Sequence, residues 1–588
     1  AALVGGKLSV KADETTELNI KVTNVAISAS IGASVGVALV RNDAKSRINA
    51  RINNASITAA NIDLLATANN QIKETEAVGF SASLLAAAAN RADVDITTVV
   101  EATTDAANLS ASDTVKISAT STNKARAQSS GGAAGGIAIG AMIADIEQGV
   151  DGTNEVLVQV GDSSVINAAK LIMDASGVDD ILAESVAGAG GLVAAVGSQS
   201  NVTSYQAVVA NVGKGVTINV TSLDVSSTLN QEIDASADAY SIGLLAGTGA
   251  GLDINVKTLA DVNLGASTNS TSPGSSATVI NAHDMKVNAF NSFDKSMYAN
   301  GKNLQTGSAS IASVSALYST TSIDNKATVN LTDGIQLIAN GSYDDKASIY
   351  IEAINDIKAV DNISLETLSL AGGINVAISE ITADSESKVN LNDALIENVT
   401  GDVYITAKTD SENRASADIL AISGLQSASG GGADVETNAT NTIDISNANI
   451  KVGDLYLYAG KSRTGVLNIL ESTSNVEITS VSTSVSINAP NPQADIVEVN
   501  NISLGANVDI KAMRDVTVEA REGIGWGDRA QESGLTLSIS AVPYGFEVDR
   551  DGDVSSTNSF TVDASANIIA GVNNKTFLQV RPVEEVQS

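Results

Sequence analysis

Apolar and polar residues alternate one by one over long stretches of this chain. From position 25 to 39 every odd residue is apolar, and the residues at 28, 30, 32, 34 and 36 are Ser or Gly. Side chains of a β-strand point to opposite sides in turn, so this pattern predicts a strand with one apolar face and one small, polar face. Counterparts follow at residues 131–144, 188–197, 241–252, 371–378, 417–425 and 535–541.

A shorter motif, apolar-x-apolar-x-small, recurs along the whole chain. Leu8, Val10 and Ala12 form the first copy, and later copies begin near positions 62, 115, 171, 223, 285, 335, 403, 455, 508 and 560. Most intervals are close to 52 residues, and so constant an interval over eleven copies is not expected by chance. A further strand-like segment precedes each new copy, as at residues 48–57 and 94–100. One repeat is therefore predicted to contain three strands joined by turns.

Strands in such a repeat cannot bury an apolar face alone, so each repeat must stack on the next. This predicts an all-β, elongated parallel β-solenoid, or β-helix, over residues 1–564, with residues 565–588 as a C-terminal cap, anchor or exchanged strand. A repeat of this length forms either one wide coil or two narrower coils, and we favour one. Tyr404 then stacks on Tyr456, which occupies the same place in the next copy.

Composition and charge favour a structural role over chemistry. The chain has 588 residues, with 34 Lys and Arg against 67 Asp and Glu, and a net charge of −33. This excess disfavours nucleic-acid binding, which needs basic patches. There is no Cys, so a disulfide scaffold and a Cys nucleophile are excluded. His283 is the only His, so a Ser-His-Asp triad would have to use it. No uninterrupted apolar stretch of about 18 residues occurs, so we expect no transmembrane helix.

The repeats resemble those of a known family. Runs such as SASIGASVGVALVRN, followed by Asn/Asp turns and a strand such as NIDLLATANN, resemble the repeats of large bacterial filamentous adhesins. These are the filamentous haemagglutinin-like proteins of two-partner secretion and the leukotoxin-type adhesins. The resemblance extends from about residue 8 to residue 564, and it implies a right-handed β-helical rod on the cell surface, used for adhesion or matrix building without catalysis. The family's N-terminal secretion domain and an end cap are not in this sequence, so we expect a segment of a longer chain, or an end covered by another subunit.

One acidic turn is a candidate cation site. Asp549, Asp551 and Asp553 alternate around Gly552, and oxygen ligands at such spacing suit Ca²⁺. A full calcium loop of the EF-hand type has Glu at its twelfth position, where this chain has Phe560. That difference favours a solvated acidic turn. No other cofactor is expected.

Other residues with potential chemistry are scattered. His283 is predicted to lie in a surface turn, and the stretch GGGAD at 430–434 is predicted to be a flexible loop. If the protein were a carbohydrate-active enzyme on a β-helix, its acids would be sought at Asp344, Asp345, Glu352 and Asp356, because glycosidases work with paired carboxyl groups.

These observations predict an extracellular or cell-surface structural protein that forms or extends a fibre and mediates adhesion or matrix building. One alternative is a self-assembling filament subunit joined head to tail, and another, from a different class, is the carbohydrate-active enzyme. Expected partners are further copies stacked end to end as a homo-oligomer or filament, neighbouring rods, and surface glycans. The charge of −33 amounts to about three net negative charges per repeat, so we expect salt or divalent cations to promote lateral association.

Overall fold

The protein is all-β in the computed structural model. The structure describes residues 5–28, 32–149, 154–266, 276–342, 344–520, 529–540, 542–545 and 553–571, and this part of the chain contains strands, turns and bends but no helix. No described helix is therefore long and apolar enough to cross a membrane.

The strands vary greatly in length, and the longest exceed 40 residues. In chain order they are β1 (Lys7–Ile27), β2 (Ala33–Asn53), β3 (Ser56–Ala59), β4 (Asn61–Ala82), β5 (Leu85–Asp105), β6 (Asn108–Ala111), β7 (Thr114–Gln148), β8 (Glu155–Val160), β9 (Val165–Asn167), β10 (Lys170–Val212), β11 (Thr217–Asn219), β12 (Ser222–Leu264), β13 (Val279–Ala282), β14 (Asp284–Lys295), β15 (Leu304–Leu331), β16 (Ile335–Ala339), β17 (Ser348–Asn392), β18 (Ala394–Ser423), β19 (Gln426–Ser446), β20 (Asn449–Ala459), β21 (Leu470–Ser482), β22 (Val485–Leu504), β23 (Asp509–Ala512), β24 (Val516–Ala520), β25 (Arg529–Ile539), β26 (Val542–Gly545), β27 (Val554–Val562) and β28 (Asn567–Ile569).

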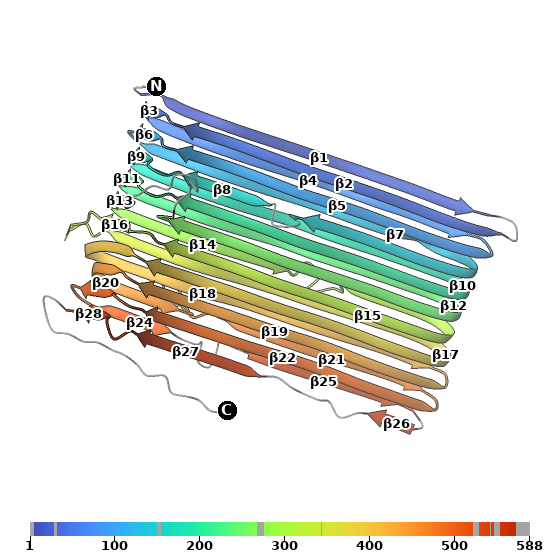
Figure 1. Ribbon diagram of the computed structural model, residues 1–588. Coiled ribbons are helices and arrows are strands. Elements are labelled where there is room, and N and C mark those ends of the chain that lie inside the picture. The colour runs from blue at the N-terminus through green and yellow to red at the C-terminus, as the bar shows by residue number, and fades with distance from the viewer. Residues whose placement is uncertain are drawn as a thin grey trace.

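Successive turns of the chain stack in parallel register, one coil per repeat (Figure 1). Leu8 pairs with Ile62, Ile62 with Val115, and Val115 with Leu171, so every strand hydrogen-bonds to its counterpart one repeat away. The expected stacking of Tyr404 on Tyr456 is confirmed, with ring centroids 4.4 Å apart and ring planes inclined by 9°. The wide single coil is therefore correct.

Each coil has three parts, as the sequence predicts. In the fourth coil, β10 runs outward from Lys170, turns near Leu192 and returns to Val212, and the short β11 then leads to the next coil. We call these parts the outgoing segment, the return segment and the short segment, and we call the end where outgoing becomes return the turn edge. The turn edge is the end at which the β1 arrow points in Figure 1.

Three of the eleven predicted repeat positions are wrong. The partner of Met285 is Ile349, not Ile335, and the partner of Leu455 is Val516, not Val508. Residues 335–339 and 509–512 belong to short segments, and residue 560 belongs to a return segment. Short segments also bury alternate residues, which is why their pattern imitates the motif.

The corrected register gives ten coils. Their outgoing segments pair through positions 8, 62, 115, 171, 223, 285, 349, 403, 455 and 516. Most of the predicted C-terminal element, residues 565–588, lies outside the described residues, which include β28 and end at residue 571.

Inward apolar side chains form two large clusters, one beside the short segments and one in the middle of the coil, and a third cluster of three residues. Between the two large clusters runs a ladder of buried polar residues. Asn70 pairs in register with Asn123, Asn123 with Asp179, and Asp179 with Gln231. The Asp179 carboxyl accepts hydrogen bonds from Asn123 (3.0 Å), Gln148 (2.8 Å) and Gln231 (2.8 Å). Burial nevertheless raises the pKa of Asp179, because the donors replace only part of the lost hydration.

Replacing Asp179 with Asn should therefore stabilise the protein at pH 8. The pKa of Asp179 is higher in the folded protein than in the unfolded chain. Its stabilising contribution is therefore complete below the unfolded pKa, and it is lost as the pH rises through the folded pKa. The increase in the free energy of unfolding caused by Asp179→Asn should vanish below about pH 4, where the carboxyl group of the parent protein is protonated in both states. The new amide has an acceptor, since Gln231 Oε1 finds no hydrogen-bond partner among the described residues. Amide hydrogen exchange in β7, β10 and β12, compared between the variant and the parent protein at each pH, measures the effect.

Asp180 provides the matched control. Burial opposes its ionisation, but Lys124 and Arg126 hold the pKa of Asp180 below its ordinary value. Asp180→Asn should therefore destabilise the protein at pH 8, with the opposite sign to Asp179→Asn. An effect of Asp179→Asn that does not change with pH would contradict the assignment.

Candidate functional site

The polarity of the strands is inverted at the turn edge. In β15, Val314 is 58% exposed and Ser315 is 1% exposed, and in β17 Ile374 is 55% exposed while Asn375 is buried. The sequence predicts the two faces of these strands, but the structure places the apolar face outward and the small polar face inward. The same holds in the first coil, where Val35 lies outward.

Small residues fill the space between the two layers at this edge, and many of them carry hydroxyl or amide groups. Ser34 lies 2.6 Å from Ser81, and Ser198 donates to Ser185 over 2.7 Å. Thr367 donates to Asn375 over 2.7 Å. These hydrogen bonds allow small polar residues to be buried here. The larger apolar residues are left on the outside.

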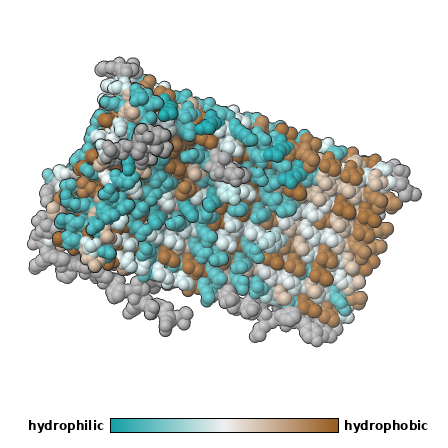
Figure 2. Space-filling view, in the orientation of Figure 1, coloured by the Kyte–Doolittle hydropathy of each residue, from teal (hydrophilic) through white to brown (hydrophobic). Residues whose placement is uncertain are grey.

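The exposed apolar side chains form a continuous surface, which we call the apolar belt. Figure 2 shows it as the brown end of the molecule. On the return segments it consists of Val35, Val37, Leu39, Leu85, Ile137, Ile139, Val193, Leu245, Val314, Ile374, Val376 and Ile487. Around the turns and on the outgoing segments it consists of Val25, Ile27, Phe80, Leu84, Leu192, Ile242, Leu244, Ile311, Leu368, Leu370, Leu420, Ile422, Leu425, Leu537 and Ile539.

Charge is nearly absent from the belt. Among the described return segments of the first nine coils, the seven register positions that begin at Ala33 contain Arg91 as the only charged residue. These positions cover roughly 23 Å along the strands and 40 Å across the coils, or about 1,000 Å². The largest apolar patch on a typical monomer is about 300–600 Å². The belt is therefore large enough to be an interaction surface.

A shallow groove crosses the belt where the outward side chains are small. It has a volume of about 690 Å³ and extends from Val193 to Ile487. Gly247 lies on its floor, and nothing stands within 4 Å of the place where a Cβ would be. The groove is open and apolar, so a side chain from another surface can enter it.

Carboxyl groups begin at the next outward register position beyond the belt. Asp145, Asp253 and Asp434 occupy it in different coils. Burial raises the pKa of each of these three groups above the ordinary value for Asp. Mild acidification therefore removes negative charge from the border of the belt before it neutralises ordinary surface carboxylates.

The predicted cation site lies mostly outside the described residues. Asp549 and Asp551 are not described, and the backbone N–H of Asp553 donates to Asp495 over 3.0 Å. Elsewhere in the described ranges, no group of three or more His, Asp or Glu side chains is placed to hold a metal ion.

The four acids considered for an enzyme are not brought together as a pair. Glu352 and Asp356 lie four residues apart on β17, about 13 Å along a strand, which exceeds the separation of about 5–9.5 Å in glycosidases. Glu352 lies 3.6 Å from Arg463. Asp344 and Asp345 lie in the bend before β17, and Asp345 lies 3.3 Å from His283.

Two further sequence interpretations have clear outcomes. His283 lies between β13 and β14 and contacts Asp284 at 3.0 Å, as expected for a surface turn. The GGGAD stretch is not a loop, because residues 430–434 form part of β19 and pair with β17 and β22. Parallel pairing on both sides supports a strand despite its three Gly residues.

An outward tyrosine ladder is the other notable surface feature. Tyr350 lies 5.6 Å from Tyr404, which stacks on Tyr456, and Arg463 covers the ring of Tyr350 at 4.4 Å. Tyr404 has a ring neighbour in each adjacent coil, so its two faces are not free to stack on a sugar. The sequence missed Tyr350 as a member because the repeat position at 335 was out of register.

Comparisons with family models, with curated proteins and with solved structures give no match to this chain.

Proposed function

We propose that this chain is a right-handed parallel β-solenoid of the cell surface or extracellular space. Its role is mechanical: it forms or extends a fibre, and its apolar belt joins neighbouring copies side by side into an adhesive or matrix-building assembly. The observation that carries the proposal is the belt, a charge-poor apolar surface that spans successive coils.

A second copy of the chain is the occupant that best fits the belt. A standard interface buries about 800 Å² per partner, and one face of the belt offers about 1,000 Å². Two belts in contact bury almost no charge, although the chain as a whole carries −33. The return segments form a parallel sheet, and two sheets pack face to face at about 10 Å when their side chains interdigitate.

Association should become stronger as salt is added. Two chains of charge −33 repel each other, and salt screens that repulsion without weakening apolar contacts. Sedimentation velocity of the intact chain, from low salt to about 1 M NaCl, should show a sedimentation coefficient that rises with protein and salt concentration. An association driven by ion pairs would weaken instead.

Two outcomes would overturn the proposal. One is a chain that stays monomeric at every concentration and salt level. The other is a monomer that floats with zwitterionic phospholipid vesicles, which would assign the belt to a lipid surface.

Head-to-tail growth is a second candidate, supported by one observation. Among the described strands β1 pairs only with β4, so within the described residues its other edge, 21 residues long, has no strand partner. Electron micrographs distinguish head-to-tail growth from lateral association. Head-to-tail growth gives threads with the width of a single chain, and lateral association gives sheets or paired rods.

A further inference from the structure

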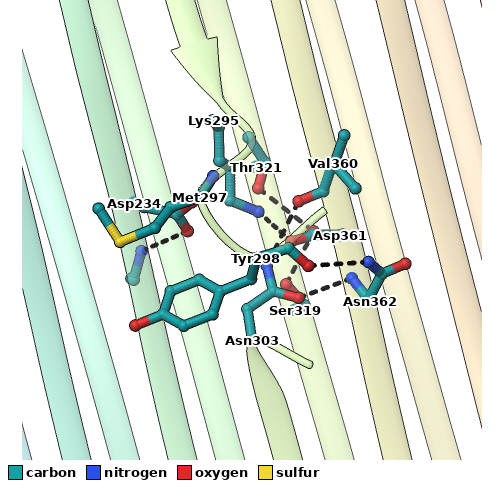
Figure 3. Close-up of polar contacts among 11 residues, drawn as sticks. Asp234, Lys295, Met297, Tyr298, Asn303, Ser319, Thr321, Val360, Asp361 and Asn362 are labelled. Carbon is teal, nitrogen blue, oxygen red and sulfur yellow. Dashed lines mark hydrogen bonds and ion pairs between the residues drawn. The ribbon is translucent and has the colours of Figure 1, made fainter. Parts of the chain in front are cut away.

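A loop in the sixth coil interrupts the parallel ladder in the middle of the stack. Lys295, at the end of β14, pairs with Ala359, and Leu304, at the start of β15, pairs with Ile363. Residues 296–303 therefore leave the ladder, and only residues 360–362 of the next coil lie opposite them. A buried polar cluster fills this interruption (Figure 3).

The cluster is centred on Lys295 and Asp361. Their side chains are both 0% exposed, and Lys295 Nζ contacts Asp361 Oδ1. Asn303 donates to the same oxygen over 2.9 Å. Ser319 (2.8 Å) and Thr321 (3.3 Å) donate to Asp361 Oδ2. The amine and the carboxyl carbon are thus held together by strands of adjacent coils.

A second carboxyl group lies beside this pair. Asp234, from the coil before, is 1% exposed and accepts hydrogen bonds from the backbone N–H groups of Ala235 (2.8 Å) and Met297 (3.0 Å). Burial raises the pKa of Asp234 to about 6, although the charge of Lys295 opposes this. Near neutral pH the group can both accept and return a proton.

The polar cluster is closed to solvent and borders apolar side chains. Ile233, Phe293 and Ile357 belong to the apolar cluster in the middle of the coil. Loop 296–303 covers the site and is held down by Asn362, which donates to the carbonyl of Tyr298 over 3.1 Å. Tyr298 in turn donates to Glu184 over 2.9 Å. Water is therefore kept away from the pair.

We propose that Lys295 and Asp361 condense to an amide, an isopeptide crosslink between the sixth and seventh coils. Keeping two charges in this closed site is costly, and converting them to a neutral amide removes that cost. After a proton passes from the ammonium to the carboxylate, the amine of Lys295 attacks Cγ of Asp361. The Nζ–Cγ bond forms, the Cγ–Oδ1 bond breaks, and the departing oxygen leaves as water with two protons that began on the lysine ammonium.

The neighbouring groups assist each stage of this condensation. Ser319 and Thr321 donate to Oδ2, where negative charge develops when the amine attacks. Asp234 acts on Lys295 through its charge, which favours the positive nitrogen that forms when the amine attacks. No oxidant, reductant or other reactant is required, since ammonium plus carboxylate equals amide plus water. The product bridges the place where the ladder is interrupted, and this inference does not depend on the proposed function.

Mass spectrometry of the intact, natively folded chain tests the proposal. We expect a mass about 18 Da below the sequence mass, from the loss of one water, and a branched peptide that joins the segments containing Lys295 and Asp361. The pair Lys124 and Asp180 is an internal control. It also joins adjacent coils, but its side chains are 45% and 30% exposed, so its peptides should stay separate.

Variants make the test sharper. Lys295→Arg keeps the ion pair but cannot form this amide, so its mass should equal the sequence mass. Asp361→Asn should yield the same amide with loss of ammonia, about 17 Da. Asp234→Asn should leave at least about ten times more chain uncrosslinked, while hydrogen exchange of β14 and β17 stays as slow as in the parent protein.

Specific results would overturn the proposal. A wild-type chain at its full sequence mass, with separate peptides for the two segments, excludes the crosslink whether or not any variant folds. A branched peptide at Lys124 as well would show that burial is not the cause. Undiminished crosslinking in Asp234→Asn would remove the contribution of Asp234 from the proposal.

Discussion

Replacing both Val314 and Ile374 with Glu should convert associated protein into monomer. The two residues pair in adjacent coils at the centre of the apolar belt, and both are more than half exposed in the single chain. A contact between two belts would bury four new carboxylates without partners, and each costs several kcal/mol. The dissociation constant should rise at least about 100-fold, since each 1.4 kcal/mol is worth a factor of ten. Sedimentation velocity measures the change.

The matched control carries the same charge on the same two strands. Ser322 and Thr382 pair with each other eight residues further along β15 and β17, outside the belt. Ser322→Glu with Thr382→Glu should reduce association only through the added net charge, and salt should restore it. If both double variants weakened association equally at high salt, the belt would not be the interface.

Truncating Ile405 should cost far more stability than truncating Ile374. Ile405 is 0% exposed in the cluster beside the short segments, so Ile405→Ala should lower the free energy of unfolding by about 2–5 kcal/mol. Ile374 faces outward, and Ile374→Ala should change the stability of the monomer by less than about 0.5 kcal/mol while weakening association. Both changes remove the same atoms, so the comparison isolates the direction of the side chain.

Hydrogen exchange is the suitable measurement, because stacked repeats need not unfold in one step. Exchange in β17 and β18 should accelerate strongly in Ile405→Ala and hardly at all in Ile374→Ala. Equal acceleration in the two variants would mean that the strand polarity at the turn edge is not inverted.

Much of the fold follows from local pattern. Strict alternation in β2 predicts a strand, because only a period of two separates apolar from small polar residues so cleanly. The constant repeat interval predicts that equivalent residues of successive repeats stack on each other. The contact between Tyr404 and Tyr456 confirms that each repeat is one coil. The predicted repeat position at Ile335 is wrong, because the short segment there alternates buried and exposed residues just as an outgoing segment does.

The Lys295 and Asp361 contact could not be predicted in the same way. The two residues are 66 positions apart, and neither belongs to a motif. They meet because residues 296–303 leave the ladder, so that Asp361 lies opposite a loop rather than a strand. The exact register of adjacent coils decides such a contact, and a shift of one residue would turn the side chain to the other face.

The sequence by itself determined that this chain is made of β-strands with two unlike faces, repeated many times. The physical reason is local, since the pleat sends neighbouring side chains to opposite sides whatever surrounds them. Only the tertiary structure decided which face lies inside. At the turn edge the two layers close around small residues, Ala and Gly together with Ser, Thr and Asn, some of which hydrogen-bond to each other, as Thr367 and Asn375 do. The larger apolar residues therefore lie outside, where Val314 and Ile374 form part of the belt.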